Sequence, residues 1–582
     1  MSTHNLLQEF PSVSTQAWEE IIQKDLKGAD YVRKLIWQTD EGLRIKPYYR
    51  GEDAKDLRYL DTAPGDFPYL RGAQSTAGWR ICEEIDTVDP EEANRAACSA
   101  VAAGAEEIAF LNVAIEDASD LEILDANLRE IPVHLENAAE PQLRLVIDRL
   151  KKRPRPAPIS TGWNPLSNLD LSAETIRIAP LGLVPFTICG AVFEESGATV
   201  TEETGFTLAA GVEFMAEMQS RKTEVDRAAA SVRFSFAIGS NFFFEIAKLR
   251  AFRLVWARAV DAFGGERGCA RAHIHARTSR WNKTVYDPHI NILRATTEAM
   301  SAVLGGADSI SVAPFDECYK APDEASRRLA RNTQILLKEE ALLSQVGDAG
   351  GGSYYLEVLT DSIAQEAWKS MQGVEVAGGF RKAHAEEYIE YLLERSRTAK
   401  EKAITSRGRV FAGTNKFANP SERALDRIDP ARIDSRRRGT TIYEQLRLRT
   451  EAHVAKGCKC PRVLLAEIGD AKMRTARSGF AADFFACVGF EIVTQQFSRI
   501  EDMAAIDADL IVLCSSDAEY LGVANLLSTE LQSRGRDIPV LVAGSPETKE
   551  HLQAAGVADF VHLRSNPIEL LSKWQQRLGI KD

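Results

Sequence analysis

RFSFAIGSNFFFEIAKLRAFRLVWARAV, residues 233–260, joins a short apolar run, Arg233–Ile238, to a long helix-like stretch, Asn241–Val260. Short apolar runs of this length are typical of buried strands, and helical stretches between such runs are typical of a parallel sheet. The same alternation continues from this stretch in both directions along the chain. The pattern therefore predicts an α/β fold.

Eight strand-like runs are expected in this region, with a helix-like stretch between most of them. They are Trp79–Ile85, Glu106–Val113, Pro132–Asn137, Pro158–Trp163, Phe186–Ala191, Arg233–Ile238, Arg271–Ser279 and Asp308–Phe315. Eight strands that alternate with helices fit a (β/α)8 barrel, the TIM barrel.

The end of the chain starts a second alternation. Five strand-like runs are expected there: RVLLAEIG (462–469), EIVTQQ (491–496), DLIVLCSS (509–516), PVLVAG (539–544) and ADFVHL (558–563). Helix-like stretches such as Thr475–Gly489 separate them. Buried-type strands with single-helix crossovers predict a flavodoxin-like doubly wound sheet.

These patterns divide the chain into four parts. They are an N-terminal arm (1–74), the barrel (75–385), a highly charged helical linker (386–457) and the doubly wound domain (458–582). Within the linker, the basic run Arg436, Arg437 and Arg438 beside Asp434 is interpreted as a solvated surface or linker.

The composition excludes several classes of protein. The 582 residues are too many for one core at roughly 100–200 residues per domain. A net charge of −13 argues against nucleic-acid binding, and neither a secretory signal nor a membrane-spanning run is expected. Nine scattered cysteines favour a reducing compartment, so a cytoplasmic location is expected. The pair Cys458 and Cys460 lacks a second ligand pair nearby, so no zinc site is expected.

Four further stretches resemble signature stretches of the methylmalonyl-CoA mutase family. They are FFFEIAKLRAFRLVWA (242–257), AVLGGADSI (302–310), GGSYYLE (351–357) and GTNKF (413–417). The likeness runs from the arm to the end of the chain. It implies a barrel that threads a CoA thioester along its axis and a C-terminal cobalamin domain. In such enzymes radical chemistry begins when the cobalt–carbon bond of the cofactor breaks.

The C-terminal domain departs from the family pattern. Catalytic members carry Asp-x-His-x-x-Gly after the first strand, and the His binds cobalt; here Lys472, Arg474 and Arg477 stand at those positions. A register shifted by two residues would retain Asp470 but would put Lys472 at the His position. Protonated Lys and Arg have no lone pair for cobalt. Ser515-Ser516-Asp517 replaces Ser-x-Leu, and Ala543-Gly544 replaces Gly-Gly. We therefore expect a degenerate cobalamin-binding-type domain.

The barrel also departs from the family pattern. Gly190-Ala191-Val192 stands where catalytic members have Gly-Tyr-His, and Glu84 replaces a Tyr on the first strand. On the eighth strand, a Gln and a His are matched by Asp308 and Ser311. Alanine and valine side chains donate no hydrogen bonds, so the polar clamp for the thioester is expected to be missing.

Three other sets of residues were weighed as sites. His273 and His275 face one side of a strand, and the family carries Arg then His there, so His275 is interpreted as a core histidine and no metal site is expected. Trp281 follows the seventh strand and is interpreted as packing at the barrel mouth. Arg44, Lys46 and Arg50 in the arm alternate with apolar and aromatic residues, which suits docking on another protein. A partner's CoA phosphates are the contact we hypothesise for them.

The resemblance implies the non-catalytic small (beta) subunit of a heterodimeric enzyme that interconverts (R)-methylmalonyl-CoA and succinyl-CoA. Adenosylcobalamin would be bound by the catalytic large subunit and not by this chain. One alternative is an active homo-oligomeric acyl-CoA mutase with an altered substrate, and another is a free-standing scaffold or metallochaperone partner of the mutase. Cobalamin absorbance of the purified chain distinguishes the first alternative from the other hypotheses.

Overall fold

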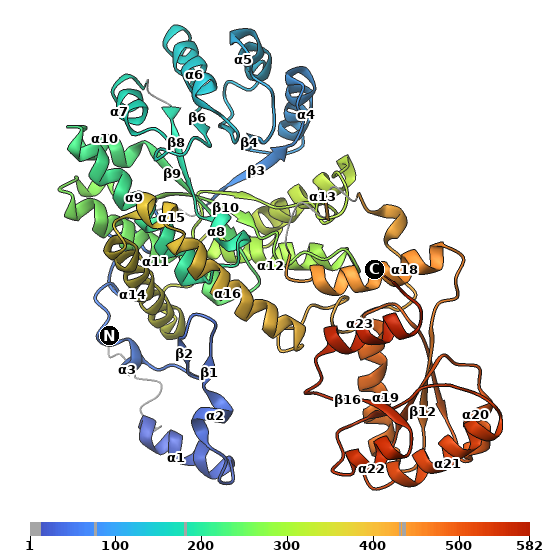
Figure 1. The fold of residues 1–582 in the computed structure, drawn as a ribbon. Helices are drawn as coiled ribbons and strands as arrows, with labels where there is room; N and C mark the ends of the chain where they lie inside the picture. Colours follow the sequence, from blue (N-terminus) through green and yellow to red (C-terminus); the bar gives the residue numbers. More distant parts are fainter. Residues whose placement is uncertain (1–12, 75–77, 180–182, 430–431, 434–437, 582) are drawn as a thin grey trace.

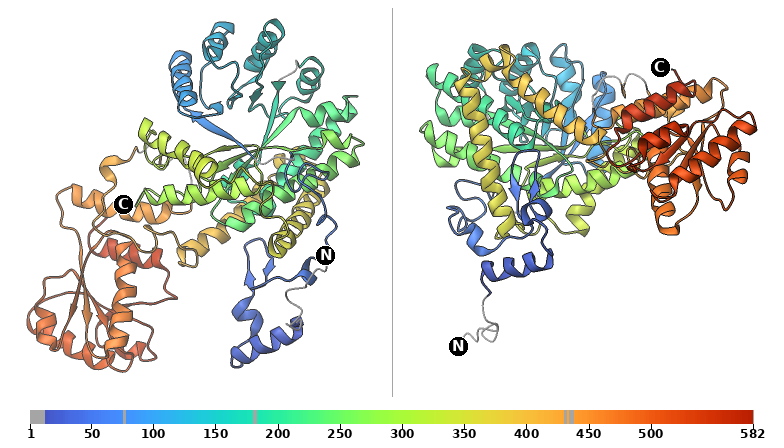
Figure 2. Two further views of the ribbon diagram at one scale, coloured as in Figure 1. Left: turned by 180° about the vertical axis from the view of Figure 1, so that it is seen from behind. Right: turned by 60° about the horizontal axis from the view of Figure 1, so that its bottom comes forward.

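The computed structural model describes residues 13–74, 78–179, 183–429, 432–433 and 438–581. It contains a barrel, an arm that extends from the barrel at the N-terminal end, and a separate C-terminal domain, joined to the barrel by a helical connector (Figures 1 and 2). No helix in the described part of the chain is long and apolar enough to cross a membrane.

The barrel strands are all parallel and lie in the order β7-β6-β5-β4-β3-β11-β10-β9-β8. Thr187 on β8 closes the barrel by donating its backbone N–H to the carbonyl of Trp163, just after β6. The strands are β3 (Arg80–Ile85), β4 (Glu107–Phe110), β5 (Val133–Leu135), β6 (Ile159–Thr161), β7 (Leu183–Val184), β8 (Phe186–Cys189), β9 (Val232–Ile238), β10 (His273–Thr278) and β11 (Ser309–Ser311). Each of the eight predicted ranges overlaps one of them, while β7 lies outside the predicted ranges. The predicted fold class is confirmed.

Helices cover the outside of this barrel (Figure 1). They are α4 (Pro90–Ala102), α5 (Ala118–Asp125), α6 (Glu140–Lys152), α7 (Leu169–Ile178), α8 (Ala191–Glu195), α9 (Val200–Ser220), α10 (Val225–Ala230), α11 (Phe242–Ala262), α12 (Ile290–Leu304), α13 (Glu324–Ile335), α14 (Tyr354–Val376) and α15 (Phe380–Ala385), with short turns η1 (Arg267–Cys269) and η2 (Leu336–Glu340). Large apolar side chains on the outward faces of the strands, such as Phe234, Phe236 and Ile310, are fully buried in one core with these helices.

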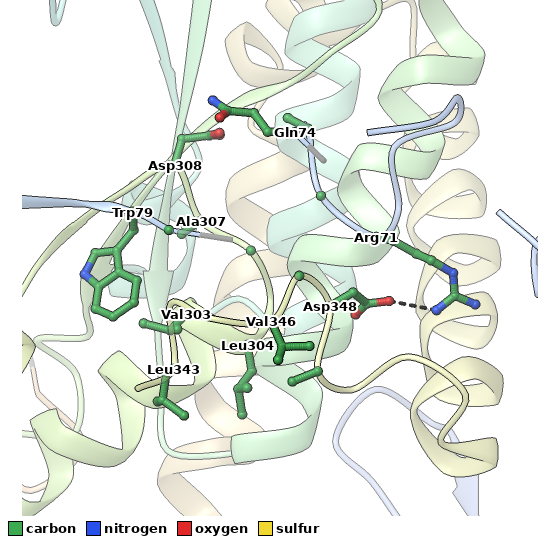
Figure 3. A pocket seen from close by; sticks show the side chains of 16 residues that line it. Arg71, Gln74, Trp79, Val303, Leu304, Ala307, Asp308, Leu343, Val346 and Asp348 are labelled. Carbon is green, nitrogen blue, oxygen red and sulfur yellow. Dashed lines mark hydrogen bonds and ion pairs between the residues drawn. The ribbon is translucent and has the colours of Figure 1, made fainter. Parts of the chain in front are cut away.

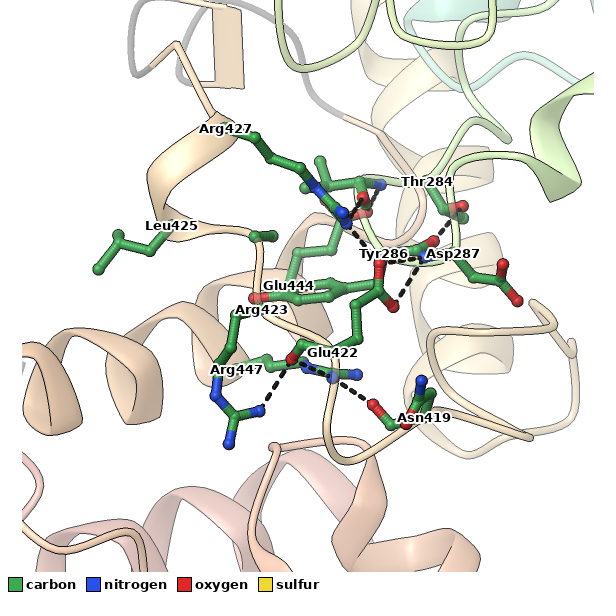
Figure 4. Close-up of polar contacts among 12 residues, drawn as sticks. Thr284, Tyr286, Asp287, Asn419, Glu422, Arg423, Leu425, Arg427, Glu444 and Arg447 are labelled. Atoms are coloured by element: carbon green, nitrogen blue, oxygen red, sulfur yellow. Dashed lines mark hydrogen bonds and ion pairs between the residues drawn. The ribbon is translucent and has the colours of Figure 1, made fainter.

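The connector contains α16 (Tyr388–Thr405), η3 (Leu425–Arg427) and α18 (Thr441–Ala455). Figure 4 shows its polar contacts with the loop after β10, where the backbone N–H of Asp287 donates to Glu422, which also pairs with Arg427. Tyr286 of that loop donates to Glu451 over 3.0 Å. The guanidinium of Arg447 lies 4.1 Å from the centre of the Tyr286 ring. The connector is therefore fixed to the barrel by buried charged and aromatic contacts.

Arg438 corrects the interpretation of the basic run as solvated. Its side chain is buried, donates to Glu444 over 2.6 Å and donates to the carbonyl of Lys283 over 2.9 Å. A neighbouring carboxylate and carbonyl thus replace the water that an arginine at a linker surface would keep. Arg436 and Arg437 lie outside the described residues.

The C-terminal domain is a five-stranded parallel sheet in the order β13-β12-β14-β15-β16, the flavodoxin-like order. Its strands are β12 (Arg462–Glu467), β13 (Glu491–Gln496), β14 (Leu510–Cys514), β15 (Val540–Ala543) and β16 (Val557–Val561). Its helices are α19 (Ala471–Ala486), α20 (Ile500–Ala505), α21 (Tyr520–Ser533), α22 (Lys549–Ala554) and α23 (Pro567–Arg577). Each predicted strand range overlaps an observed strand, so the predicted class of this domain is also confirmed.

The arm consists of α1 (Thr15–Asp25), α2 (Tyr31–Leu35), the hairpin strands β1 (Trp37–Gln38) and β2 (Arg44–Ile45), and α3 (Gly51–Ala54). Tyr48 and Tyr49, the aromatic residues between Lys46 and Arg50, both have aromatic neighbours within the chain. The Tyr48 ring lies 6.0 Å from the Trp18 ring, and the Tyr49 ring lies 5.1 Å from that of Tyr355 on α14. Aromatic neighbours distant in sequence therefore cover both tyrosines in part.

We expect Phe234→Ala to lower the free energy of unfolding of the barrel by about 3–5 kcal/mol, because the ring is fully buried and packs 4.7 Å from both Phe252 and Trp256. Urea unfolding followed by tryptophan fluorescence measures the change. Phe243→Ala is the matched control, since Phe243 is 46% exposed and its loss should cost about 1 kcal/mol or less. Equal midpoints for the two variants would contradict this assignment of the core.

Candidate functional site

Barrel enzymes build their active sites at the carboxyl ends of the strands. In this chain, an ion pair between two strands lies at that end of the barrel. Arg277 near the end of β10 makes a bidentate ion pair with Glu84 on β3, through Nε at 2.7 Å and Nη2 at 2.9 Å. The two side chains are 11% and 15% exposed. Glu84, which the resemblance aligns with a tyrosine, is therefore held by an arginine two strands away, on the other side of β11.

The pair extends into a network around the mouth. Nη2 of Arg277 also contacts Glu317, in the loop after β11, at 2.8 Å. Glu317 in turn accepts from Nε of Arg280 over 3.0 Å, and Arg280 reaches Glu195 at the end of α8. Burial lowers the pKa of Arg277, but the carboxylates of Glu317 and Glu84 outweigh burial and raise it well above its usual value. Arg277 stays charged, and the network consists of fixed ion pairs at the carboxyl ends of the strands.

A second charged layer lies deeper in the barrel. Glu107 on β4 accepts from Arg80 over 2.8 Å and pairs with Arg233 at 3.1 Å. Burial alone would raise the pKa of Glu107, but Arg233 and Arg80 lower it to about 2. Most barrels fill this space with branched apolar side chains. Here arginine side chains fill it, and their charge is matched by carboxylates.

Histidines complete this layer. His134 contacts Ser160 and Glu136 at 2.8 Å each, and Nδ1 of His275 lies 2.8 Å from the hydroxyl of Ser309. Nε2 of His273 lies 3.0 Å from Arg80. Burial, with nearby Arg233, lowers the pKa of His275 well below its usual value. His275 is therefore a neutral core histidine, as the sequence predicts.

One group of potential metal ligands does form in the described part of the barrel. Single atoms of Cys82, Glu107 and His275 all lie within 4.8 Å of one another. These residues come from three strands, so the sequence offered no spacing signal for them. Burial raises the pKa of Cys82 well above its usual value, which favours the thiol over the metal-binding thiolate. The guanidinium groups on Glu107 also oppose a metal cation.

The other barrel positions singled out from the sequence lie apart. Ala191 and Val192 begin α8, and the Val192 side chain is 49% exposed. Ser311 ends β11 and is buried. Asp308 lies before β11, at the opposite end of the barrel from Arg277, beside a cavity of about 50 Å³ (Figure 3). Its carboxylate accepts from the backbone N–H of Ile274 over 2.7 Å, a structural role.

The C-terminal domain brings several altered motif positions together at the carboxyl edge of its sheet. Arg477 on α19 pairs with Asp517 at 3.1 Å. A Cβ atom on Gly544 would lie 2.9 Å from Nη1 of Arg477, so the guanidinium lies against this glycine. Arg474 donates to the carbonyl of Gly469 over 2.8 Å. The two arginine side chains therefore lie beside the strand ends and are held there by hydrogen bonds and an ion pair within the domain.

The remaining motif positions in this domain have other partners. Ser515 donates to Glu519 over 2.7 Å, and Lys472 is exposed in the first turn of α19. Asp470 caps α19 by accepting from the N–H of Met473. His562, after β16, accepts from the N–H of Arg564 through Nδ1. The positions aligned with the Asp-x-His-x-x-Gly motif thus present ammonium and guanidinium groups, which do not fit a cobalt atom.

The basic residues of the arm are largely used within the chain. Lys46 pairs with Asp53 at 2.5 Å, and Arg50 donates to the carbonyl of Val13 over 2.5 Å. Arg44 on β2 is exposed. Of these three side chains, that of Arg44 alone forms no ion pair or hydrogen bond with the described residues, so it is free to meet a ligand.

Trp281, as the packing interpretation predicts, is 5% exposed and packs with Ile404 and Phe411 of the connector. The residues that the sequence did not reveal are Arg277 and Glu317. One signal was available in the sequence: Arg277 lies within a strand that was predicted to be buried. A buried arginine requires a carboxylate partner, so a glutamate or aspartate beside it could have been expected.

Comparisons with known proteins agree with the fold. The family model for methylmalonyl-CoA mutase matches residues 38–125 and 181–461. The methylmalonyl-CoA mutase small subunit of Porphyromonas gingivalis is 36% identical over 99% of this chain and 99% of its own length. The small subunit of Streptomyces virginiae is 30% identical over 99% and 98%. The methylmalonyl-CoA mutase of Cereibacter sphaeroides is 33% identical over 71% of this chain and 65% of its own length.

We expect the free energy of unfolding to fall as the pH drops below about 6.5, where histidines protonate in the unfolded chain. The folded chain keeps His275 neutral because its pKa is lowered, so the unfolded chain binds more protons. Each such histidine contributes a slope of about 1.4 kcal/mol per pH unit. In urea titrations between pH 6.5 and 5.5, His275→Asn should reduce the slope by about that amount.

The control is His551→Asn on α22, which removes an exposed histidine and leaves the barrel core intact. An unchanged slope in the His275→Asn protein would show that His275 is protonated when folded.

Proposed function

Because the chain belongs to the methylmalonyl-CoA mutase family, we propose that it is the small subunit of a heterodimeric adenosylcobalamin-dependent mutase. In this role it stabilises the catalytic large subunit and performs no chemistry of its own. The complex interconverts (R)-methylmalonyl-CoA and succinyl-CoA, and the large subunit holds the cofactor.

The observation that carries the proposal is the ion pair of Arg277 with Glu84 and Glu317 at the mouth of the barrel. A thioester that followed the barrel axis would have to displace charged groups that are nearly buried. Separating such a pair leaves uncompensated charges and costs about 3–5 kcal/mol. The free carboxylate of methylmalonyl-CoA could pair with Arg277 only by expelling Glu84 or Glu317. The expelled carboxylate would be left without its cation in a nearly buried position, so this barrel favours its own closed state.

The cofactor domain supports the same conclusion. Arg474 stands where the resemblance places the cobalt ligand, and Arg477 with Asp517 occupies the strand edge. Positive side chains at the ligand position repel a cobalt cation and supply no lone pair. The full-length relatives named small subunits support the assignment of a partner large subunit.

We expect the purified chain to bind no adenosylcobalamin and to show no mutase turnover. Calorimetry with adenosylcobalamin and absorbance at the cobalamin bands test the first part. Binding with a Kd of about 1 μM or tighter would contradict the account of the C-terminal domain. Co-purification of a larger cobalamin-binding homologue from the native host tests the proposed partner.

The Arg474→His variant is the matched control for the barrel half of the proposal. It restores an imidazole in the C-terminal domain but leaves Arg277 and Glu84 in place. Isomerisation of methylmalonyl-CoA by this single variant would refute a degenerate barrel.

The arm supplies the remaining part of the proposal, in which Arg44, Lys46 or Arg50 lies close to the CoA phosphates of the partner. The exposed side chain of Arg44 supports a contact with these phosphates, whereas Lys46 would first have to break its ion pair with Asp53. Changing all three to Ala should raise KM for methylmalonyl-CoA about tenfold in the heterodimer with kcat nearly unchanged, as expected when one charge-assisted hydrogen bond of about 1.5 kcal/mol is lost.

The control is a triple alanine variant of Lys24, Lys27 and Lys34, which removes the same charge from exposed positions of the arm. Equal KM values for both triple variants would exclude a specific phosphate contact.

A further inference from the structure

A cavity of about 410 Å³ lies where the arm, the barrel and the connector meet. Asp40 and Glu41 line it from the arm, Glu194 and Glu245 from the barrel, and Lys400 from α16 of the connector. It lies beside the mouth network, and none of the residues that we assign to the proposed function lines it.

The charges of the ionisable groups around the cavity sum to a net negative value. Five carboxylates line it: Asp40, Glu41, Glu194, Glu203 and Glu245. Asp40 pairs with Arg409, and Lys248 pairs with Glu203 at 2.7 Å and with Glu245 at 2.5 Å. Lys400 is the third cation, and the N-termini of α9 and α11 add about half a positive charge each. With all five carboxylates ionised, about one negative charge therefore remains. Burial raises the pKa of Glu41, that of Glu194 to about 6 and that of Glu203 to about 8, so a cation bound in the cavity would favour the ionised forms.

Glu194 is the carboxylate with an unused oxygen. Its Oε1 accepts from the hydroxyl of Ser279 over 2.7 Å, whereas its Oε2 is buried and has no hydrogen-bond partner. Glu194 is only 9% exposed, so solvent does not replace the missing partner. Lys400 donates to the carbonyl of Ala198. A buried acceptor without a donor is costly, and a ligand with a donor would relieve that cost.

The walls of the cavity favour an organic cation over a metal ion. Trp37, Trp281 and Phe411 line it and offer apolar surface to the carbon chain of an organic ligand. The ammonium of Lys400 already lies 5.8 Å from the centre of the Trp281 ring, so a second ammonium would bind elsewhere in the cavity. The group of ligand atoms within 4.8 Å that could hold a metal in the described chain is the one inside the barrel, so the carboxylates of this cavity do not converge as metal ligands do.

We propose that this cavity binds a small organic molecule that carries one ammonium group. The ammonium donates to Oε2 of Glu194, and the aromatic rings cover the apolar part of the molecule. The single positive charge of the ligand balances the charge left over in the cavity.

Ligand-observed NMR on the full chain at neutral pH tests the proposal with three probes of similar size: n-butylammonium, n-butanol and butyrate. We expect n-butylammonium to bind with a Kd on the order of 1 mM, as suits so small a ligand. n-Butanol and butyrate should not bind. Glu194→Gln should weaken n-butylammonium binding at least about tenfold, the loss expected for one charged contact.

Glu401→Gln is the matched control, because Glu401 is the exposed neighbour of Lys400 on the same helix and its loss should leave binding unchanged. If Glu194→Gln fails to fold, Glu41→Gln on the arm side of the cavity should weaken binding several-fold. The proposal is overturned if n-butylammonium fails to bind, if n-butanol or butyrate binds as well, if magnesium chloride displaces the amine at equal concentration, or if binding survives in the glutamine variant.

Discussion

The bidentate contact between Arg277 and Glu84 is the constraint on which the interior of this barrel depends. A guanidinium that is taken from water must keep its charge matched, so the carboxylates of Glu84 and Glu317 have to stay beside it. Glu317 in turn places Arg280, which reaches Glu195 beyond the next strand. The ends of four strands or their loops are thereby connected around one side of the barrel mouth. Apolar side chains in the same space would impose no such fixed geometry.

Stability and specificity have separate sources in this fold. Buried ion pairs gain little over well-packed apolar groups, so the charged axis adds little net stability. The outward faces of the strands, with Phe234 and Ile310 buried under helices, supply the hydrophobic stabilisation. The charged layers instead select one arrangement of the strands, because a shift in register would leave Glu107 or Arg233 without a partner. The buried contacts of Arg438 and Tyr286 hold the connector in the same way.

Much of the fold follows from local patterns in the sequence. Apolar runs of strand length and the helix-like stretches between them predict both sheets, because the outward faces of parallel strands must be apolar under their helices. The altered motif positions in the C-terminal domain were also visible, since Arg474 and Asp517 lie in contiguous motifs. The network at the mouth was not visible, because residues 84, 277 and 317 meet only when the barrel closes. Arg438 was misjudged for the same reason: its partner Glu444 is near in sequence, but the burial comes from the distant loop at Lys283.

The number of CoA esters that one heterodimer binds tests the central claim most directly, namely that charged side chains keep this barrel closed to substrate. Equilibrium dialysis of succinyl-CoA against the purified complex without cofactor gives that number. The account predicts one ester per heterodimer, bound by the large subunit. Two esters per heterodimer would show that the ion pairs of Arg277 yield to substrate and would contradict the account.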